Sequence, residues 1–197
     1  MPADAQTLGI YDDKAADYAA RFAPDQPDTR LAGFIASLPL GGSVLDLGCG
    51  PGRAAAQMRD AGLQVTAIDA SPGMVALARE TYGLDVTLGT FDDITGTAIY
   101  EGVWASFSLL HAPRGDMPRH LAALHQALKP GGRLMIGLKS GTGSRRDALG
   151  RFYTYYQPDE VLGLLQAAGF TPTSTETGAE PGLDGTVAPW IIVMADA

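Results

Sequence analysis

An acidic residue stands just before a cluster of glycines in residues 44–52, which read VLDLGCGPG. Glycine lets the backbone turn sharply or lets a ligand approach it closely, and a helix N-terminus offers unpaired N–H groups. A dinucleotide site calls for the spacing Gly-x-Gly-x-x-Gly, with pyrophosphate on those N–H groups. Here the spacing is Gly-x-Gly-x-Gly, and the Asp46 carboxylate would repel a pyrophosphate. The pattern therefore favours a ligand that carries an ammonium group.

A second acid, Asp69, ends the next predicted strand, roughly twenty residues after Gly48, where an acid can accept hydrogen bonds from ribose hydroxyls. The alternative is an aspartate that caps the helix beginning near Ser71. S-adenosylmethionine carries an ammonium, a sulfonium and a ribose but no phosphate. Asp46 and Asp69, in register with the glycine loop, therefore favour S-adenosylmethionine over a dinucleotide.

Three segments, in the correct order, resemble the class I S-adenosylmethionine-dependent methyltransferases, including small bacterial members. Residues 44–52 look like the family's first motif, residues 65–74 (VTAIDASPGM) like its second, and residues 128–134 (LKPGGRL) like its turn into the fifth strand. The resemblance covers almost the whole chain, from Tyr11 to the last predicted strand. It implies methyl transfer from S-adenosylmethionine to a small-molecule acceptor, with S-adenosylhomocysteine as the other product.

The resemblance also implies where the reactive end of the cofactor would lie. Asp46, Gly48 and Gly50 would surround its methionine end. Ser106 and Phe107, which follow the fourth predicted strand, would lie near the sulfonium. These residues come from neighbouring loops at one edge of the predicted sheet.

For the other end of the cofactor, the resemblance places Asp69 on the ribose, Ala70 and Met74 against the adenosine, and Phe91 beside the adenine ring. Thr90 stands where the family commonly has an acid, so this sequence departs from the pattern at the adenine. The full set of expected cofactor-binding residues is Tyr11, Tyr18, Asp46, Gly48, Cys49, Gly50, Gly52, Asp69, Ala70, Met74, Thr90, Phe91, Ser106 and Phe107.

Methyl transfer from a sulfonium has a good leaving group, and bringing the reactants together can account for roughly 7–11 kcal/mol of the barrier. A general base is therefore optional. His111 is the candidate catalytic base, because an imidazole can accept a proton near neutral pH; the alternative is a histidine that hydrogen-bonds a backbone carbonyl and shapes the pocket. We expect His120 and His125 at the surface of the next helix, and the sequence shows no metal-ligand cluster.

Residues 151–156, which read RFYTYY, are unusually rich in aromatic side chains. Arg145 and Arg151 could pair with an acidic group of a substrate, and Tyr153 and Tyr155 could cover a ring or an aliphatic part. The alternative is a half-buried extended segment whose tyrosines pack on the sheet. The resemblance favours substrate contacts slightly, because the loop after the fifth strand often supplies them in this family.

An N-terminal helix carries Tyr11 and Tyr18, and in similar small methyltransferases this segment covers the active site as a lid. The alternative is an amphipathic helix that is docked permanently. We expect a single domain, with a helical lid over residues 1–40, a cofactor-binding core over residues 41–140 and a substrate side over residues 141–197.

Hydrophobic periodicity predicts the elements that position these residues. Helices are predicted over residues 4–23, 28–39, 53–61, 116–128 and 159–168, with another starting at Ser71-Pro72, and strands over residues 43–47, 64–68, 84–88, 102–107, 133–138, 170–176 and 187–195. Residues 141–150 are predicted as a polar loop, and the last two strands as antiparallel partners. The alternation predicts an α/β fold with a doubly wound, mostly parallel seven-stranded sheet and helices on both faces.

Composition limits the classes of partner that the chain is expected to bind. The 197 residues carry a formal net charge of −8, which disfavours nucleic acid as a partner. The single cysteine excludes an internal disulfide. From the polar first residues we expect no signal peptide, and no apolar stretch of the sequence approaches the roughly 20 residues that a membrane span needs. We therefore expect a cytoplasmic monomer or homodimer that acts on a small molecule. A non-catalytic S-adenosylmethionine-binding protein and a nicotinamide-dependent oxidoreductase remain as alternatives.

Overall fold

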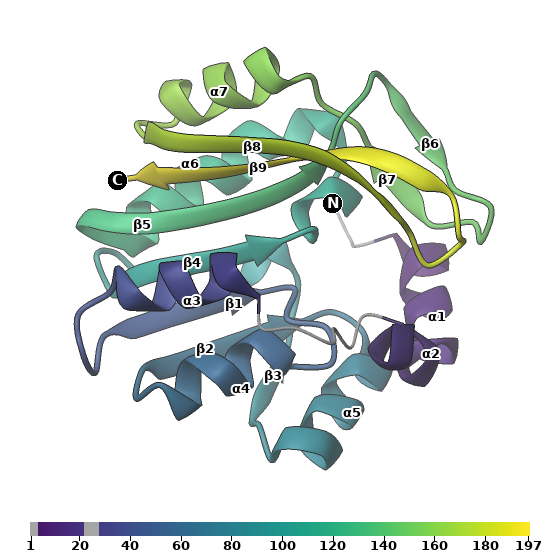
Figure 1. Cartoon of the computed structure of the whole chain (residues 1–197), viewed down its shortest axis with the longest axis horizontal. Coiled ribbons are helices and arrows are strands. Elements are labelled where there is room, and N and C mark those ends of the chain that lie inside the picture. The colour runs from purple at the N-terminus through teal and green to yellow at the C-terminus, as the bar shows by residue number, and fades with distance from the viewer. Residues whose placement is uncertain (1–3, 22–27) are drawn as a thin grey trace.

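A seven-stranded sheet in the order β3-β2-β1-β4-β5-β9-β8 runs through the centre of the computed structural model, which describes residues 4–21 and 28–197 (Figure 1). The strands β1 to β5 pair in parallel, and β9 lies antiparallel between β5 and β8. The strands are β1 (Ser43–Leu47), β2 (Gln64–Asp69), β3 (Val86–Leu88), β4 (Tyr100–Ser106), β5 (Leu128–Lys139), β8 (Thr171–Pro181) and β9 (Val187–Asp196). The predicted fold class and the antiparallel final pair are confirmed.

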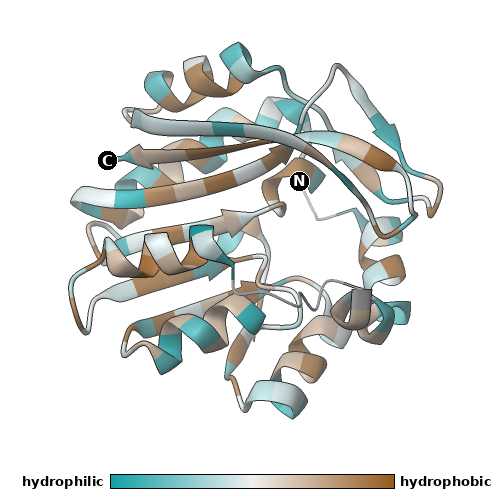
Figure 2. Cartoon of the chain, viewed as in Figure 1, coloured by the Kyte–Doolittle hydropathy of each residue, from teal (hydrophilic) through white to brown (hydrophobic). Residues whose placement is uncertain are grey.

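Helices cover both faces of this sheet. They are α1 (Ala5–Asp13), α2 (Ala15–Arg21), α3 (Thr29–Ala36), α4 (Arg53–Asp60), α5 (Pro72–Tyr82), α6 (Met117–Ala127) and α7 (Pro158–Ala167). Alternate residues of one strand face opposite sides, so Val44 packs in the cluster with α3 and α4, whereas Leu45 and Leu47 pack in the cluster with α6 and α7. Figure 2 shows the same pattern as apolar strands between helices with polar outer surfaces.

The predicted N-terminal helix is divided. Its α1 ends where the Lys14 N–H bonds the Ile10 carbonyl, and α2 starts at Ala15. The predicted end at Ala23 and the breaks at Pro24 and Pro27 lie outside the described residues. A tertiary contact lies at this point: Asp12, near the end of α1, accepts hydrogen bonds from Ser71 Oγ at 2.5 Å and from the Gly73 N–H at 2.9 Å. The contact fastens α1 to the start of α5.

Residues 141–150 do not form the loop that the polar sequence predicts. Residues Ser144–Arg146 form β6, which pairs antiparallel with β7 (Phe152–Thr154) in a separate two-stranded sheet. The prediction was wrong here because β6 is exposed on all three residues and carries no apolar alternation. Its partner strand, which packs on the core, decides its conformation.

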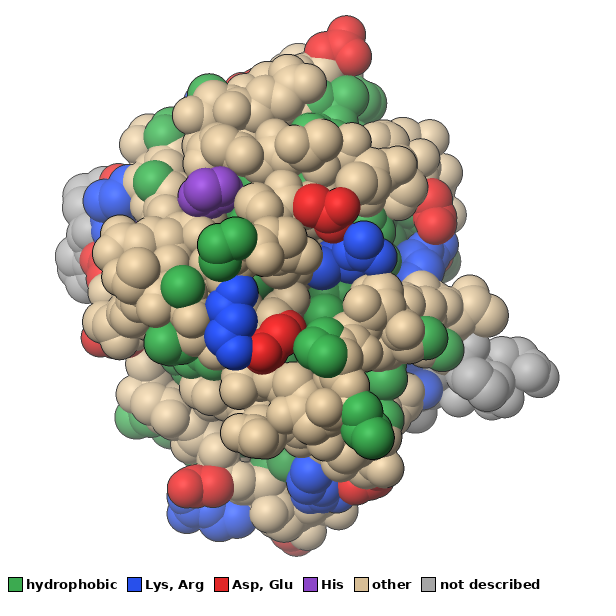
Figure 3. Space-filling model, turned by 90° about the vertical axis from the view of Figure 1, so that its left-hand side faces the viewer, with side chains coloured by type: hydrophobic (Ala, Val, Ile, Leu, Met, Phe, Trp, Pro, Cys, Tyr) green, Lys and Arg blue, Asp and Glu red, His purple; other side chains and the backbone are tan. Residues whose placement is uncertain are grey.

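The carboxyl ends of the parallel strands all lie on the right-hand side in Figure 1, facing α1, α2 and the β6–β7 hairpin. Ligands of open α/β sheets bind at this edge. The opposite end of the sheet carries ion pairs such as Lys129–Glu101 and Arg133–Asp196, and Figure 3 shows acidic and basic side chains interspersed on that face.

Candidate functional site

The glycine loop after β1 follows a path that only glycine adopts without strain. Gly48, Gly50 and Gly52 have φ of 70°, 54° and 82°. A Cβ on Gly48 would lie 2.3 Å from the Ser108 Cβ, whereas a Cβ on Gly50 would meet only Tyr18 Cε1 at 3.9 Å. Gly48 is therefore needed for packing, and Gly50 leaves the backbone open to a ligand.

Asp69 ties this loop to the next one. Its Oδ2 accepts a hydrogen bond from the Gly50 N–H at 2.7 Å, and its Oδ1 accepts one from the Ser71 N–H at 2.9 Å. Burial raises the pKa of Asp69. The cap of α5 is Ser71, whose hydroxyl accepts from the Met74 N–H, with Pro72 at the first helical position as predicted. Asp69 therefore ends β2 beside the glycine turn, and Ser71 rather than Asp69 is the helix cap.

Asp46 is a buried carboxylate, with 2% of its surface exposed. Among the described residues its Oδ2 has no hydrogen-bond partner. Burial, and after it the negative charge of Asp69, raises the pKa of Asp46 to about 7. Burial of a carboxylate whose charge is not paired is costly, so a cationic group placed beside Oδ2 would stabilise the ionised form of Asp46.

A cavity of about 420 Å³ opens beside the glycine loop, and another of about 430 Å³ adjoins it. We call them the adenosine-side and the hairpin-side cavity. The predicted residues that line the adenosine-side cavity are Tyr11, Tyr18, Gly48, Gly50, Asp69, Ala70, Met74, Thr90, Phe91, Ser106, Phe107 and His111. The predicted residues that line the hairpin-side cavity are Tyr11, Tyr18, Asp46, Gly48, Cys49, Gly50, Ser106, Phe107, Arg151 and Tyr153. Both cavities thus meet at the loop and at the end of β4, whereas Gly52 lines neither.

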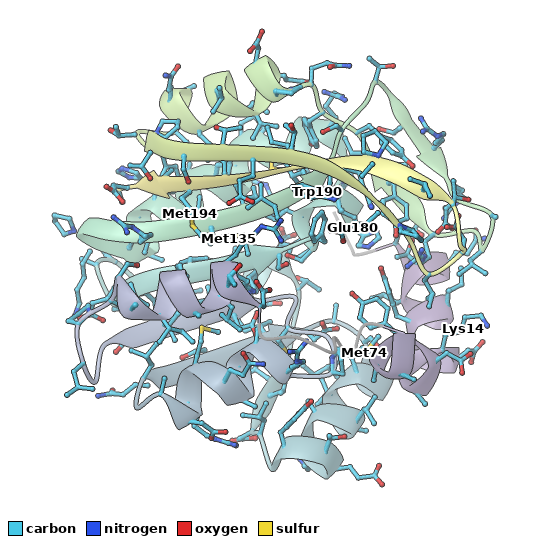
Figure 4. The ribbon with its side chains drawn as sticks, viewed as in Figure 1. Lys14, Met74, Met135, Glu180, Trp190 and Met194 are labelled. Atoms are coloured by element: carbon cyan, nitrogen blue, oxygen red, sulfur yellow. The ribbon has the colours of Figure 1, made fainter. Side chains whose placement is uncertain are left out.

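The remaining expected cofactor contacts occupy distinct positions around these cavities. Met74 lies near the start of α5, at the lower edge of the central gap in Figure 4. Thr90 caps the N-terminal end of the short helical turn Phe91–Asp93. Its hydroxyl accepts a hydrogen bond from the Asp92 N–H at 3.2 Å and donates one to the Asp93 carboxylate at 3.0 Å. Thr90 therefore shapes the loop that carries Phe91 along the cavity.

Both ring nitrogens of His111 are hydrogen-bonded. Its Nδ1 lies 2.6 Å from the Phe152 carbonyl, and its Nε2 lies 2.8 Å from the Tyr11 hydroxyl. A carbonyl can only accept, so Nδ1 carries the proton and Nε2 accepts from Tyr11. Burial lowers the pKa of His111 to about 4. The imidazole is neutral and its basic nitrogen faces Tyr11, so the carbonyl contact and a role as base are compatible.

The N-terminal helix α1 is fastened to the β6–β7 hairpin. The Thr7 hydroxyl accepts from the Phe152 N–H at 2.8 Å. Arg146 donates to both carboxylate oxygens of Asp4 at 2.9 Å. Together with the Tyr11–His111 bond, these contacts hold α1 against the adenosine-side cavity, which Thr7 and Tyr11 line.

The expected substrate residues are separated by the fold. Arg151 is 3% exposed and donates two hydrogen bonds to Asp147 Oδ2, at 2.9 Å from Nε and 2.6 Å from Nη2, so its charge is paired within the protein. The Arg145 guanidinium carbon lies 3.8 Å from the centre of the Tyr155 ring. Neither Arg145 nor Tyr155 lines the adenosine-side or the hairpin-side cavity. Only Tyr153 and Arg151 of the four border a cavity at the loop.

Two buried polar residues at the adenosine-side cavity escaped the sequence reasoning. His120 is 3% exposed, so its predicted surface position was wrong; His125 is partly buried against Phe170. His120 lies three residues after the buried Met117, on the apolar face of α6, and this spacing is the signal that could have placed it inside. Within residues 4–21 and 28–197, His120 Nδ1 and Ser108 Oγ have no hydrogen-bond partner.

The described residues contain no group of His, Cys, Asp and Glu suited to hold a metal ion. They also contain no helix that is both long and apolar enough to pass through a bilayer.

Comparison with known proteins agrees with this geometry. A family model for a methyltransferase domain matches residues 44–132. The O-methyltransferase cnsE of Penicillium expansum is 32% identical over 181 residues, which cover 83% of this chain and 64% of that protein. A ubiquinone biosynthesis O-methyltransferase of Xanthomonas oryzae is 34% identical over 121 residues, which cover 57% of this chain and 50% of that protein.

The chain thus spans between half and about two thirds of the length of these two curated relatives. Among solved structures, the 1,6-didemethyltoxoflavin-N1-methyltransferase of Burkholderia thailandensis superposes with a TM-score of 0.70 at 23% identity, covering 100% of this chain and 91% of that one. That similarity shows the shared fold. Residues 44–132 thus match a methyltransferase domain, and motifs, strand order and relatives all make the chain similar to the class I S-adenosylmethionine-dependent methyltransferases.

Proposed function

We propose that this chain transfers the methyl group of S-adenosylmethionine to a small-molecule acceptor by in-line displacement and releases S-adenosylhomocysteine. The observation that carries the proposal is the buried Asp46 carboxylate, whose Oδ2 lacks a partner among the described residues. Asp46 lines the hairpin-side cavity together with Gly50, whose backbone is open to a ligand. An ammonium group at this position would pair with the Asp46 carboxylate, whose Oδ2 has no hydrogen-bond partner among the described residues.

The residues around the loop fit the rest of the cofactor. Asp69 would accept from the ribose hydroxyls, and Ala70, Met74 and Phe91 would pack against the adenosine. When bound, S-adenosylmethionine supplies a methyl group on a sulfonium that leaves readily. The protein's own contribution is to hold the acceptor in line with that methyl group and to exclude water.

A hydroxyl oxygen is the acceptor atom that the chain's features support. Two curated relatives carry the name O-methyltransferase. The Nε2 atom of neutral His111 is the group placed to accept the hydroxyl proton, in place of the hydrogen bond from Tyr11. An imidazole with a lowered pKa is a weak base, so an acidic hydroxyl on an aromatic ring fits better than an aliphatic alcohol.

We further propose that residues 1–40 act as the lid of a single domain. The contacts of Asp4, Thr7 and Tyr11 with the β6–β7 hairpin support a closed position of α1. Opening requires these few polar contacts to break, which is a small cost compared with unfolding a core helix. A monomer or homodimer in the cytoplasm, without a nucleic-acid partner, completes the proposal; the free Cys49 and the net charge of −8 support it.

Two other functions compete with this one. A nicotinamide-dependent oxidoreductase would place pyrophosphate at the glycine loop, next to Asp46 and Asp69, where two carboxylates would repel it. A non-catalytic S-adenosylmethionine-binding protein would use the same loop but leave His111 idle. Binding of NADH rather than S-adenosylmethionine would identify the oxidoreductase. Binding of S-adenosylmethionine without methyl transfer would identify the non-catalytic binding protein.

The test is calorimetric titration with S-adenosylmethionine, S-adenosylhomocysteine and NADH. It compares the wild-type chain with Asp69→Ala and with Asp85→Ala, whose side chain is fully exposed on the surface after α5. We expect micromolar binding of the two adenosyl ligands, at least about ten-fold weaker in Asp69→Ala and unchanged in Asp85→Ala. Thermal melting checks that the Asp69→Ala variant is folded. Binding of NADH in place of the adenosyl ligands would contradict the proposal.

A further inference from the structure

The hairpin-side cavity is lined by a lysine, Lys139, that is not one of the expected cofactor-binding residues. Lys139 ends β5, is half-buried and lines this cavity. Its ammonium lies 5.6 Å from the centre of the Phe107 ring. Within residues 4–21 and 28–197, no carboxylate forms an ion pair with Lys139. A half-buried ammonium without a counter-ion is unusual, because burial of a charge is costly unless it is paired.

Among the described residues, no other charged side chain at this cavity forms an ion pair with Lys139. Arg151 is already paired with Asp147, and Asp46 lies at the glycine loop, where the proposed cofactor places its ammonium. Arg53 stands at the start of α4. The exposed Glu180 on β8, and Asp184, favour the charged form of Lys139 through their negative charge, but neither forms an ion pair with it among the described residues. Figure 4 shows Glu180 and Trp190 at the edge of the central gap, beneath the β8–β9 hairpin. Within the described residues the half-buried Lys139 ammonium therefore has no carboxylate at ion-pair distance.

A second unpaired donor lies next to Lys139. Trp190 is the cross-strand partner of Lys139 in the β5–β9 pair, and it also lines the hairpin-side cavity. The residue is 6% exposed, and its indole Nε1 has no hydrogen-bond partner among the described residues. Tyr153 and Phe107 add aromatic surface to the same cavity. Two donors and aromatic walls suit a planar molecule with an anionic oxygen.

The strand order of the sheet separates most of the expected cofactor residues from Lys139 and Trp190. The residues for the cofactor follow β1, β2 and β3, whereas Lys139 and Trp190 lie on β5 and β9, on the other side of β4. Ser106 and Phe107, at the end of β4, line both cavities and are the place expected for the sulfonium. Asp46 and Cys49 border the same cavity at the glycine loop, so the part of it beside β5 and β9 is what the expected cofactor residues leave for the acceptor. The rings of His111 and Tyr153 meet edge to face with their centres 4.7 Å apart, and Tyr153 lines the hairpin-side cavity, so the candidate base adjoins this side.

We propose that Lys139 and the Trp190 indole N–H bind a carboxylate on the methyl acceptor, so that the substrate is an aromatic hydroxy acid whose hydroxyl faces His111. This inference rests on the proposed function and names its substrate class. It gives the anion-binding role to Lys139, because Arg151 is held by Asp147 and Arg145 lies outside both cavities.

The experiment uses the full chain saturated with S-adenosylhomocysteine and titrated with 3,4-dihydroxybenzoate or with catechol, which lacks the carboxylate. Lys139→Met removes the charge and keeps the length, Lys139→Arg restores a charge, and Trp190→Phe removes only the indole N–H. Lys129→Met is the matched control, because Lys129 lies on the same strand and pairs with Glu101 far from the cavity.

We expect wild type and Lys129→Met to bind 3,4-dihydroxybenzoate at least about ten-fold more tightly than catechol. Lys139→Met should lose this preference, Trp190→Phe should reduce it, and Lys139→Arg should regain part of it, all with unchanged affinity for S-adenosylhomocysteine. An unchanged preference in Lys139→Met, or no binding of either compound to wild type, would overturn the inference. Weaker binding of S-adenosylhomocysteine in Lys139→Met would reassign the lysine to the cofactor. Failure of wild type to bind S-adenosylhomocysteine at all would instead contradict the proposed function.

Discussion

Tyr11 and His111, 100 positions apart in the chain, share a hydrogen bond of 2.8 Å between the phenol oxygen and Nε2. The same phenol oxygen accepts from Arg151 Nη1 at 3.1 Å. The basic nitrogen of the candidate base is therefore covered by the N-terminal helix when that helix is docked. An acceptor hydroxyl that reaches His111 must take the place of Tyr11.

Replacement of His111 by Phe tests its role as base. We expect kcat to fall about 100-fold, because a positioned general base contributes that much or more, while the affinity for S-adenosylhomocysteine stays the same. Single-turnover methylation of 3,4-dihydroxybenzoate measures the rate, and calorimetry measures binding. Tyr11→Phe is the control: it keeps the imidazole and removes the competing hydroxyl. Equal rates for wild type and His111→Phe would leave His111 as a pocket residue only.

The lowered pKa of His111 sets a pH dependence with a definite sign. The native group has a pKa of about 4 against an ordinary value of 6.5, so between these values the unfolded chain binds the proton and the native chain does not. The free energy of unfolding should therefore rise with pH through this window because of His111. Urea unfolding of wild type and His111→Phe between pH 4 and pH 7 measures it. A variant with the same pH slope as wild type would show that His111 does not supply it.

Asp46→Asn should stabilise the ligand-free chain and weaken its cofactor binding. The native pKa of Asp46 is about 7 against an ordinary 3.8, so ionisation opposes folding increasingly from pH 4 to pH 7. Removing the charge should raise the free energy of unfolding at pH 8 by on the order of 2 to 4 kcal/mol, with little gain at pH 4. Urea unfolding at both pH values gives the difference.

The same Asp46→Asn protein should bind S-adenosylmethionine at least about ten-fold less tightly at pH 8, because the ammonium loses its charged partner. Calorimetry measures this affinity. A variant that is no more stable than wild type, yet binds normally, would contradict both the unpaired state of Asp46 and its contact with the cofactor's ammonium.

Gly48→Ala and Gly50→Ala should separate packing from binding at the loop. Both positions have positive φ, so each alanine adds roughly 1–2 kcal/mol of backbone strain. At Gly48 the new methyl group also meets Ser108 at 2.3 Å, so this variant should lose on the order of 3 kcal/mol of stability in urea unfolding. Gly50→Ala should lose less stability and still bind S-adenosylhomocysteine poorly. Equal stability losses would contradict the open position of Gly50.

Arg146→Ala should loosen the lid without affecting the core. The Arg146–Asp4 pair is partly exposed, so its loss should change global stability by less than about 1 kcal/mol. Hydrogen exchange in residues 5–13 should become faster, because the hairpin loses its contact with the start of α1. Arg145→Ala is the matched control, since Arg145 stacks on Tyr155 and makes no contact with Asp4. Unchanged exchange in Arg146→Ala would show that Thr7 and Tyr11 suffice to hold the helix.

Local sequence determined most of the sheet and the cofactor loop. Short apolar runs bounded by glycine predicted β1 and β2 within a residue of their observed ends, and Ser71-Pro72 predicted the start of α5. These elements depend on turn chemistry and apolar periodicity, both of which can be read within a few residues. The acids Asp46 and Asp69 were recognisable for the same reason, because their spacing from the glycines is local.

Only the tertiary structure decided how distant segments meet around the site. The pairing of Arg151 with Asp147, the contact of Tyr11 with His111 and the unpaired Lys139 beside Trp190 depend on side chains from separate elements. Strand β6 forms because β7 offers it a partner, and His120 is buried because α6 packs on the sheet. Periodicity and turn chemistry act over a few residues, whereas charge pairing and burial are settled by the neighbours that folding brings from elsewhere in the chain.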